Sequence, residues 1–530
     1  MPQQTLPLLF KAKQRWDEDE RVYDNPPPRD IIRWILASRG SNSSIKKRFI
    51  AQIVIDDLWQ RGEFYTTPTD DHFFFENKEK TLLPIESKQL RAQIKERYDL
   101  NPTESEYKFL IAELRAEATL RGKKASVFQF AHYDAARNIL YIYNNAHQVY
   151  RLDGERIELV NNGTDGVFFL HKPQCEPFYY LGTHNQNNLD ELMINPVNFS
   201  KGDNVILNRD EQRILFRLWL YSLFFESLLP TKPIQVLIGP KGSGKTMAQK
   251  VIGKLLFGEQ FQVTEMPSRE DAFVTKITHK YFVAFDNVDG RTTWLNDQLA
   301  RVATGEEITR RRLYTTNDEA TYVPRCFLSL STREPDFRRD DVVDRLLIFQ
   351  LDRLKEWHNE FEMLQTVLKH RDVLWTELLN NLSNIVAGLS ELPESLTSQY
   401  RMADFALLAQ RIATAIGLND VVKKLFLKMN QAQSEFLFDE EPIWYCLQQW
   451  LEMGNSGRSI SSGELFTELK QIASINEMAF PYKSARSFGM RLKNILTNLR
   501  EFVDVDVRKG RSNRQIYIFT KRENSERFSF

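Results

Sequence analysis

Cysteine and histidine are scarce in this sequence of 530 residues. The three cysteines, Cys175, Cys326 and Cys446, are far apart, and the eight histidines are scattered. This spacing excludes a C-x-x-C zinc site and a disulfide framework, and it is typical of a reducing compartment. The sequence therefore predicts no zinc centre.

The sequence also lacks a signal-peptide pattern and any apolar run near the roughly 18 residues of a membrane span. We therefore expect a cytoplasmic protein with no membrane partner. It lacks a net charge as well, because 71 Lys and Arg balance 71 Asp and Glu, so any contact with nucleic acid must come from local basic patches. The composition is that of a globular protein, and the length predicts about three or four domains.

What the chain does contain is a glycine-rich loop within residues 233–246, PIQVLIGPKGSGKT. An apolar run precedes the loop and helix-forming sequence follows it, which fits the phosphate-binding pattern G-x-x-x-x-G-K-[ST]. In such a loop the backbone N–H groups and the helix N-terminus hold phosphate, Lys245 reaches the β- and γ-oxygens, and Thr246 can ligate Mg²⁺. The alternative is a chance glycine-rich turn. The expected nucleotide-binding residues are Gly239, Pro240, Lys241, Gly242, Ser243, Gly244, Lys245 and Thr246.

A second apolar strand is predicted at residues 280–290, KYFVAFDNVDG, and ends in Asp286. An acid in this position after a phosphate-binding loop can hold Mg²⁺ directly or through water. The metal ligands expected from the protein are therefore Thr246 and Asp286, and the expected cofactors are ATP and Mg²⁺.

The region before the loop mixes helical and β patterns. Apolar residues at helical spacing predict two helices over 30–62, a hairpin follows, helices return over 86–122, and short aromatic or β-branched runs over 126–170 predict strands. Asp56 and Asp57 lie in helical sequence, where a solvated or capping role is expected. Residues 209–229 predict one apolar helix buried against the nucleotide-binding core.

The segment after Asp286 contains a helix over 294–303, a hairpin formed by ITRRRLY and ATYVP, a strand over 325–335 and the run RRDDVVDRLLIFQL at 338–351. This ordered series resembles superfamily 3 helicases, especially the phage, plasmid and poxvirus primase-helicase group. The resemblance implies an AAA+ ATPase that forms hexamers and translocates on DNA. It also implies that the hairpin residues Arg310, Arg311 and Arg312 line a central pore and contact phosphates; the alternative is a solvated charged strand face.

The same resemblance implies further site residues. The strand containing Thr332 and Arg333 occupies the sensor 1 position, and Arg345 matches the arginine finger that reaches the γ-phosphate of the neighbouring subunit. The alternative for Arg345 is an ion pair with Asp341, four residues earlier. The run YRMADFALLAQRIA resembles the helical lid of AAA+ helicases, in which Arg401 would sense nucleotide; the alternative is an exposed arginine at a helix start.

Two departures from the family pattern concern catalysis. Many AAA+ proteins follow the metal acid with a Glu that polarises water, whereas Asn287 follows Asp286 here. Asn cannot act as a base, so Asp289 or another acid must serve, or hydrolysis is slow. The sensor 1 position, usually Asn, is Thr332-Arg333 here.

The C-terminal region predicts three helices followed by a β-hairpin with a basic tip, the pattern of a winged helix. A capping box, Ser461-x-x-Glu464, opens the second helix. Residues 483–521 hold ten Lys and Arg against three Asp and Glu, a local excess that suits phosphate contact. The alternative is a protein-contact module with a solubilising tip. The expected DNA-binding residues here are Arg486, Lys493, Arg508, Lys509, Arg511 and Arg514.

Together these patterns predict a multidomain chain with an α+β N-terminal domain, an α/β AAA+ P-loop ATPase core with a helical lid, and a C-terminal winged helix. The predicted boundaries are 1–29 for a flexible lead-in, 30–200, 201–355, 356–435 and 436–530. The predicted function is an ATP-driven hexameric DNA helicase for a phage, plasmid or mobile element, with a primase or origin-binding protein as a further partner. The alternative is a nucleotide-switched DNA-binding or assembly ATPase, such as a defence or transposition regulator, that unwinds nothing. The chain has no zinc-binding cysteines and no D-x-D pair that we assign to primase catalysis, so it is not expected to be a primase itself.

Overall fold

The computed structural model describes most of the chain. The described residues are 27–38, 43–182, 188–202, 205–278, 280–311, 319–322, 324–334, 337, 339–356, 359–389, 400, 402–438, 442–476, 478–509 and 515–521. The predicted lead-in of residues 1–29 lies almost wholly outside them. Within these ranges, no helix is both long enough and apolar enough to cross a membrane.

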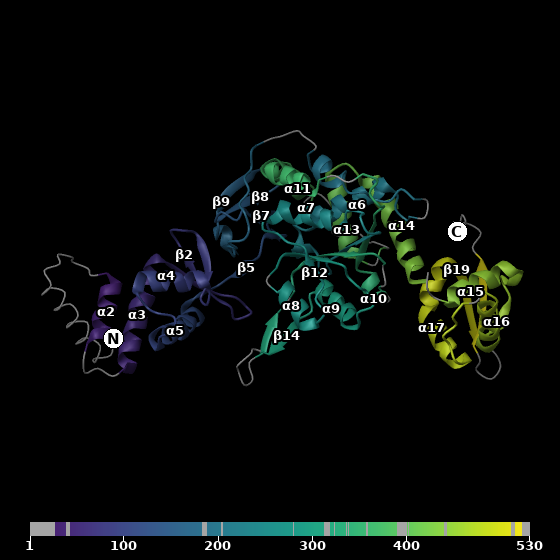
Figure 1. Ribbon diagram of the computed structural model, residues 1–530, viewed down its shortest axis with the longest axis horizontal. Helices are drawn as coiled ribbons and strands as arrows, with labels where there is room; N and C mark the ends of the chain where they lie inside the picture. The colour runs from purple at the N-terminus through teal and green to yellow at the C-terminus, as the bar shows by residue number, and fades with distance from the viewer. Residues whose placement is uncertain are drawn as a thin grey trace.

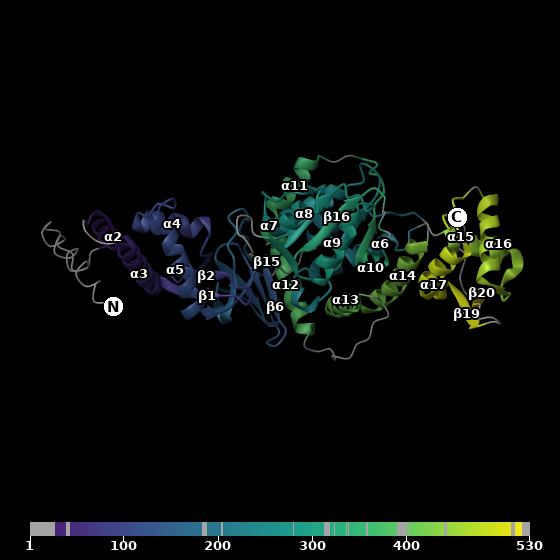
Figure 2. The same ribbon diagram turned by 90° about the horizontal axis from the view of Figure 1, so that it is seen from below.

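In the described part of the N-terminal region, four helices lie on a small sheet at one end of the molecule (Figure 1, Figure 2). The helices are α2 (Pro28–Ala37), α3 (Ser43–Arg61), α4 (Lys88–Tyr98) and α5 (Ser105–Arg121). The sheet has the order β3-β2-β1-β4, and its strands are β1 (Gly62–Thr66), β2 (His72–Glu76), β3 (Thr81–Pro84) and β4 (Lys123–Lys124). The predicted helices and hairpin are confirmed.

One acidic residue of α3 has a different role from the one expected. The carboxylate of Asp57 accepts hydrogen bonds from Arg97 Nε at 2.9 Å and from the Tyr98 hydroxyl at 2.6 Å. Its side chain is only 13% exposed. Asp57 therefore joins α3 to α4 as a partly buried ion pair, and the expectation of a solvated or capping residue is wrong for it.

A second sheet follows as a meander of the order β6-β7-β8-β9. Its strands are β6 (Ala131–Asp134), β7 (Ile139–Tyr143), β8 (Gln148–Leu152) and β9 (Ile157–Asn161), and the short parallel pair is β5 (Ser126–Phe128) with β10 (Val167–Phe169). The predicted β region over 126–170 is confirmed. One face of the meander, with Leu140, Ile142 and Leu152, belongs to the same hydrophobic cluster as Leu237 and Phe349 further along the chain.

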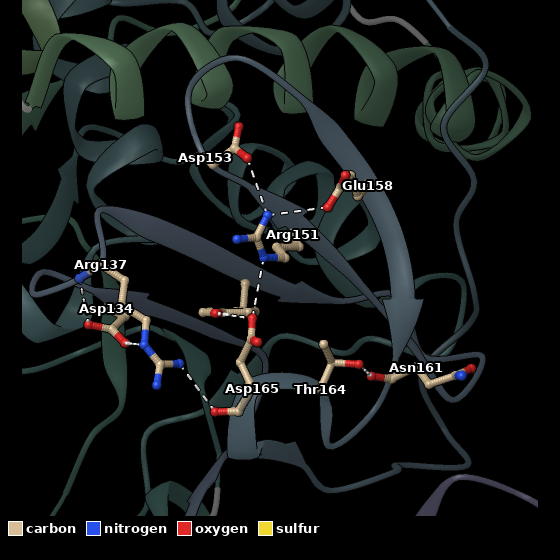
Figure 3. A network of polar contacts seen from close by, with 9 residues as sticks. Asp134, Arg137, Arg151, Asp153, Glu158, Asn161, Thr164 and Asp165 are labelled. Atoms are coloured by element: carbon tan, nitrogen blue, oxygen red, sulfur yellow. Dashed lines mark hydrogen bonds and ion pairs between the residues drawn. The ribbon is translucent and has the colours of Figure 1, made fainter.

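The other face of this sheet carries a polar network around Arg151 on β8 (Figure 3). Arg151 pairs with Asp153 and Glu158, each at 3.2 Å, and its Nε donates to Asp165 at 3.3 Å. Asp165 lies in the turn η1 (Thr164–Gly166) with φ +58° and also accepts the Tyr141 hydroxyl at 2.8 Å. The network therefore holds this turn against the sheet.

The central sheet is parallel and has the order β12-β13-β16-β11-β17. Its strands are β11 (Ile234–Ile238), β12 (Thr264–Glu265), β13 (Phe282–Asp286), β16 (Phe327–Thr332) and β17 (Leu346–Gln350). Nearly every residue of β11, β13 and β16 is buried, which is the pattern of parallel strands covered on both faces.

Helices cover both faces of this sheet. Leu237 and Phe349 pack in one cluster with α6 (Arg209–Ser222), α7 (Lys245–Phe257) and α12 (Arg371–Leu389), whereas Val236 and Leu330 pack in another with α8 (Glu270–Ile277), α9 (Thr293–Thr304) and α10 (Asp340–Val343). The prediction of one helix over 209–229 is wrong beyond Ser222. There the backbone changes to 3-10 hydrogen bonds between residues three apart, such as Phe225 N–H to Ser222 O. The 3-10 turn η3 (Glu226–Leu228) follows.

The described part of the core region also contains a hairpin and further helices. The hairpin pairs β14 (Ile308–Arg311) with β15 (Glu319–Tyr322) in antiparallel register, as predicted. The helices are α11 (Glu360–Lys369), α13 (Ala403–Ala415) and α14 (Asn419–Phe438). Together with α12 they confirm the predicted helical structure over 352–435 from residue 360 onward, whereas residues 352–356 are not helical.

The C-terminal region lies at the opposite end of the molecule from α2–α5 (Figure 1). It contains α15 (Pro442–Trp450), β18 (Ser459–Ser461), α16 (Ser462–Ile475), α17 (Ala485–Phe502), β19 (Val503–Lys509) and β20 (Gln515–Lys521), with a sheet of the order β18-β20-β19. The predicted capping box is confirmed, because Glu464 N–H donates to Ser461 Oγ and Glu464 Oε2 accepts from Ser461 N–H. Strand β18 was not predicted.

Candidate functional site

The glycine-rich loop joins β11 to α7 at the carboxyl edge of the central sheet. Gly242 and Gly244 have φ of +79° and +86°, a conformation that a side chain disfavours. Gly239 is required for space, since a Cβ there would lie 2.4 Å from the carbonyl oxygen of Leu351. The loop is also held from outside, because Leu354 N–H donates to Gly242 O at 3.0 Å. The backbone therefore curves as a phosphate cradle must.

Lys245, the first residue of α7, is folded onto this loop. Its ammonium donates to the carbonyl oxygens of Gly239 at 2.5 Å and Pro240 at 3.0 Å, and to Ser243 Oγ at 3.2 Å. Burial lowers the pKa of Lys245, and the nearby charge of Arg333 lowers it further, while Asp286 opposes this. Lys241 and Pro240 are exposed on the outside of the loop, whereas Ser243 is buried.

Asp286 ends β13 beside the loop and meets Thr246. The Thr246 hydroxyl donates to Asp286 Oδ2 at 2.9 Å, and the other carboxylate oxygen accepts from Asn287 N–H at 2.9 Å and from the Ser331 hydroxyl. The structure thus brings together the two predicted metal ligands. No group of three or more His, Cys, Asp or Glu forms a metal site in the described ranges. One hydroxyl and one carboxylate suit Mg²⁺, which is commonly bound by one or two protein oxygens together with phosphates and water.

Ser331 is a site residue that the sequence analysis missed. It lies on β16, which pairs with both β11 and β13, and its carbonyl accepts Val288 N–H at 2.9 Å. A signal exists in the strand itself, because Ser329 and Ser331 are two polar residues on one face of a buried strand whose other face carries Leu328 and Leu330. Gln249 of α7 contacts that same face, since its Nε2 donates to Ser329 Oγ at 3.1 Å.

The two candidate positions for water activation are both poorly suited to it. Asn287 is exposed, carries no acid and has φ +53°. Asp289 is exposed too, and Arg291 holds both of its oxygens at 3.0 and 3.2 Å. The hydrogen bonds from Arg291 lower the pKa of Asp289, which makes this carboxylate a weaker base.

Thr332 and Arg333 lie at the carboxyl end of β16. Thr332 is buried and its hydroxyl donates to Glu334 O at 2.8 Å, so its oxygen is engaged in the local turn. Arg333 is exposed and close enough to Lys245 to act on its pKa. Of the two, only Arg333 carries a charge, and that charge acts on Lys245 in the glycine-rich loop.

Arg345 lies in the turn between α10 and β17 and is anchored by its backbone, since its carbonyl accepts Ile234 N–H at 2.9 Å. Its side chain is 22% exposed, donates from Nη1 to Asp341 O and lies 3.7 Å from Asp341 Oδ2. The ion pair expected as the alternative is thus present within the single chain. The role of Arg345 as a finger stays a prediction.

The predicted DNA-contacting residues fall into two groups. In the hairpin, Arg310 pairs with Ala320 and Arg311 with Glu319 in backbone register. In the C-terminal region, Arg486 and Lys493 are exposed and seven residues apart on α17, and Arg508 on β19 is exposed but pairs with Asp506 at 2.8 Å. Lys509 is described only by its backbone, at the end of β19. The predicted residues that lie outside the described ones are Arg312, Arg401, Arg511 and Arg514.

Comparisons with known proteins give one family and several distant structures. Residues 209–425 match the family model "Actinomycete integrative conjugative element replication protein". No curated protein sequence matches the chain. The chain is thus similar to replication proteins over the segment that contains the phosphate loop, Asp286 and Arg345.

Among solved structures, the NrS-1 C-terminal region has 12% identity, a TM-score of 0.42, and coverage of 88% of this chain and 98% of that chain. A structure titled "SCCmec type IV Cch - active helicase" has 12% identity, a TM-score of 0.43, and coverage of 87% and 92%. JCV helicase has 13% identity, a TM-score of 0.21, and coverage of 44% and 65%. Scores this low carry no residue-level argument.

Proposed function

We propose that this chain is an ATP-driven DNA helicase that works as a homo-hexamer in the replication of a phage, plasmid or other mobile element. The observation that carries the proposal is the meeting of Lys245, Thr246 and Asp286 at the carboxyl edge of a parallel sheet. The match of residues 209–425 to a replication-protein family named for an integrative conjugative element supports the biological setting.

The site residues suggest how ATP would be held. Its phosphates would enter the loop at the N-terminus of α7, where unpaired N–H groups and the helix dipole favour negative charge. Lys245 would exchange its loop carbonyls for β- and γ-phosphate oxygens. Thr246 and Asp286 would hold Mg²⁺, which neutralises phosphate charge during transfer. Arg333 would add positive charge beside the γ-phosphate.

Three further parts of the proposed helicase lie away from this loop: Arg345, the arginine hairpin and the C-terminal region. Arg345 of one subunit would complete the ATP site of the next, which makes turnover depend on a ring. The hairpin with Arg310, Arg311 and Arg312 would move single-stranded DNA through the pore. The α15–α17 region with its three-stranded sheet has the element order expected of a winged helix, and exposed Arg486 and Lys493 on α17 would contact duplex phosphates. A primase or origin-binding protein is the proposed further partner.

The test is ATP-dependent unwinding of a forked duplex by the wild type, by Lys245→Ala and by the control Lys276→Ala. Lys276 is an exposed lysine of α8 outside the phosphate loop. We expect the wild type and the control to hydrolyse ATP faster with DNA and to displace the strand, and Lys245→Ala to do neither. Strand displacement by Lys245→Ala at the wild-type rate, or none by a wild type whose hydrolysis ignores DNA, would contradict the helicase proposal.

A second candidate function has one observation in its favour. Asn287 has no acidic group and Asp289 is held by Arg291, so neither predicted position offers a free base for water. A nucleotide-switched DNA-binding or assembly ATPase would need ATP binding and only slow hydrolysis. ATP-dependent assembly on DNA, measured by analytical ultracentrifugation, together with no strand displacement, would favour this second function.

A further inference from the structure

Three charged residues form a ladder next to the turn that carries Arg345. Asp297 lies on α9, Arg339 precedes α10, and Asp341 lies in the first turn of α10. Arg339 donates from Nη1 to Asp297, from Nε to Asp341 Oδ1 at 3.0 Å and from Nη2 to Asp341 Oδ2 at 2.8 Å. The guanidinium of Arg339 therefore bridges two helices and grips the carboxylate of Asp341 with two parallel bonds.

The two hydrogen bonds from Arg339 to Asp341 determine which group Arg345 binds. Both carboxylate oxygens of Asp341 are bonded to Arg339, whereas the nearest approach of Arg345 to that carboxylate is 3.7 Å. The hydrogen bonds from Arg339 are also the largest cause of the lowered pKa of Asp341, ahead of the charge of Arg345. The direct bond of Arg345 is to the backbone carbonyl of Asp341. Arg345 is thus oriented by the neutral carbonyl of Asp341, while both oxygens of the Asp341 carboxylate accept hydrogen bonds from Arg339.

The distinction matters for an arginine that must stabilise charge on another subunit. A guanidinium paired closely with a carboxylate contributes little net field and must break that pair before it can meet a phosphate. A guanidinium hydrogen-bonded to a neutral carbonyl retains most of its positive field. Resting on the proposed function, we propose that Arg339 is a positioning residue for Arg345: it occupies both oxygens of the Asp341 carboxylate, so that Arg345 keeps only a 3.7 Å contact with this carboxylate and its charge remains available to the neighbouring subunit.

The competing explanation is that Arg339 only ties α9 to α10 through Asp297. The two explanations differ in what a second substitution does. If Arg339 only links the two helices, removing the Asp341 carboxylate as well will not restore kcat. If Arg339 acts by occupying the carboxylate, then Arg339→Gln allows the Asp341 carboxylate to pair closely with Arg345. Adding Asp341→Asn removes this carboxylate, while the backbone carbonyl of residue 341 remains to orient Arg345.

The experiment measures kcat and KM of DNA-stimulated ATP hydrolysis by the full chain at low salt. The variants are Arg345→Ala, Arg339→Gln, Arg339→Gln with Asp341→Asn, and the control Arg269→Gln. Arg269 is a matched control, because it also pairs with an aspartate two residues later, Asp271, at 3.1 Å. Low salt is chosen because the ladder is about half exposed and is screened as ionic strength rises.

We expect Arg339→Gln to lower kcat by about fivefold with KM within about twofold, as loss of an exposed charge arrangement implies. The double variant should return to within about twofold of the wild type, and the control should match it. An Arg339→Gln variant with the kcat of the control, or a double variant as slow as the single one, would overturn the inference.

The same experiment separates this inference from the function on which it rests. Loss of activity in Arg345→Ala by about a thousandfold, without rescue in the double variant, would remove the role of Arg339 and leave the finger standing. Wild-type turnover in Arg345→Ala would remove the finger and, with it, the role of Arg339. A wild type without ATP turnover would remove the proposed function itself.

Discussion

Arg371 at the start of α12 offers a direct test of how the phosphate-loop helix is held. The residue is only 5% exposed. Its Nε donates to Leu255 O at 2.8 Å and its Nη2 to Leu256 O at 3.2 Å, and both carbonyls belong to the last turn of α7. Its remaining bonds are to Pro177 O at 2.6 Å and Glu176 O at 3.1 Å. A cation at a helix C-terminus is also favoured by the helix dipole.

The substitution to examine is Arg371→Met, which keeps the aliphatic stem and removes the donors. Leu255 O keeps the Trp375 indole N–H at 2.9 Å, and Glu176 O keeps Asn145 Nδ2 at 3.3 Å. Leu256 O and Pro177 O lose the side-chain donor that holds them. At about 1–3 kcal/mol for each buried acceptor left without a partner, the loss is about 2–6 kcal/mol.

One effect works in the opposite direction. Burial lowers the pKa of Arg371 to about 10, which means that the folded protein bears a desolvation cost for this charge. Methionine relieves that cost, so we expect the lower part of the range, about 2–4 kcal/mol of lost stability. Arg371→Lys should fall between the wild type and Arg371→Met, because an ammonium lacks the planar set of five donors.

The assay is urea unfolding followed by circular dichroism, with Arg91→Met as the control. Arg91 is an exposed arginine of α4, and we expect its substitution to change the unfolding free energy by less than about 0.5 kcal/mol. An Arg371→Met variant as stable as this control, with an unchanged m-value, would refute the reasoning that the carbonyls of Leu256 and Pro177 need this guanidinium.

Two further predictions concern the loop and the N-terminal sheets. Gly239→Ala should weaken ATP binding at least about tenfold in a calorimetric titration, because its Cβ would lie 2.4 Å from Leu351 O and force the loop to move; unchanged affinity would contradict this. Burial lowers the pKa of both His147 and His171, whose rings lie 4.4 Å apart, and the charge of His147 lowers the pKa of His171 further. The unfolded chain therefore binds more protons near pH 6, so stability should rise with pH through the histidine range and fall in acid. The double variant His147→Gln with His171→Gln should flatten this dependence between about pH 5.5 and 7.5, and an unchanged slope would contradict the assignment.

Local patterns in the sequence determined much of what the structure shows. The run from Gly239 to Thr246 fixes a strand, a turn and a helix start, because its glycines, lysine and threonine act over a few neighbouring residues. The capping box of Ser461 and Glu464 is likewise a contact between residues three apart. The helices over 30–62 and 86–122 follow from apolar spacing. Such short-range features need no knowledge of the remaining chain.

Tertiary structure decided the features that join distant segments. Ser331 meets Asp286 only because β16 lies between β11 and β13, an order that residue spacing does not specify. The end of α6 at Ser222 and the small strand β18 depend on how the chain packs, since their sequences suit more than one conformation.

The pair of Arg339 with Asp341 is local and follows from their spacing in the sequence. The bond from Arg339 to Asp297 forms only because α9 and α10 are neighbours. A sequence therefore states which groups a protein can bring to a site, because propensities and caps act within a turn or a strand. Which of those groups meet is set by long-range packing, because burial of the whole core chooses the arrangement of its elements.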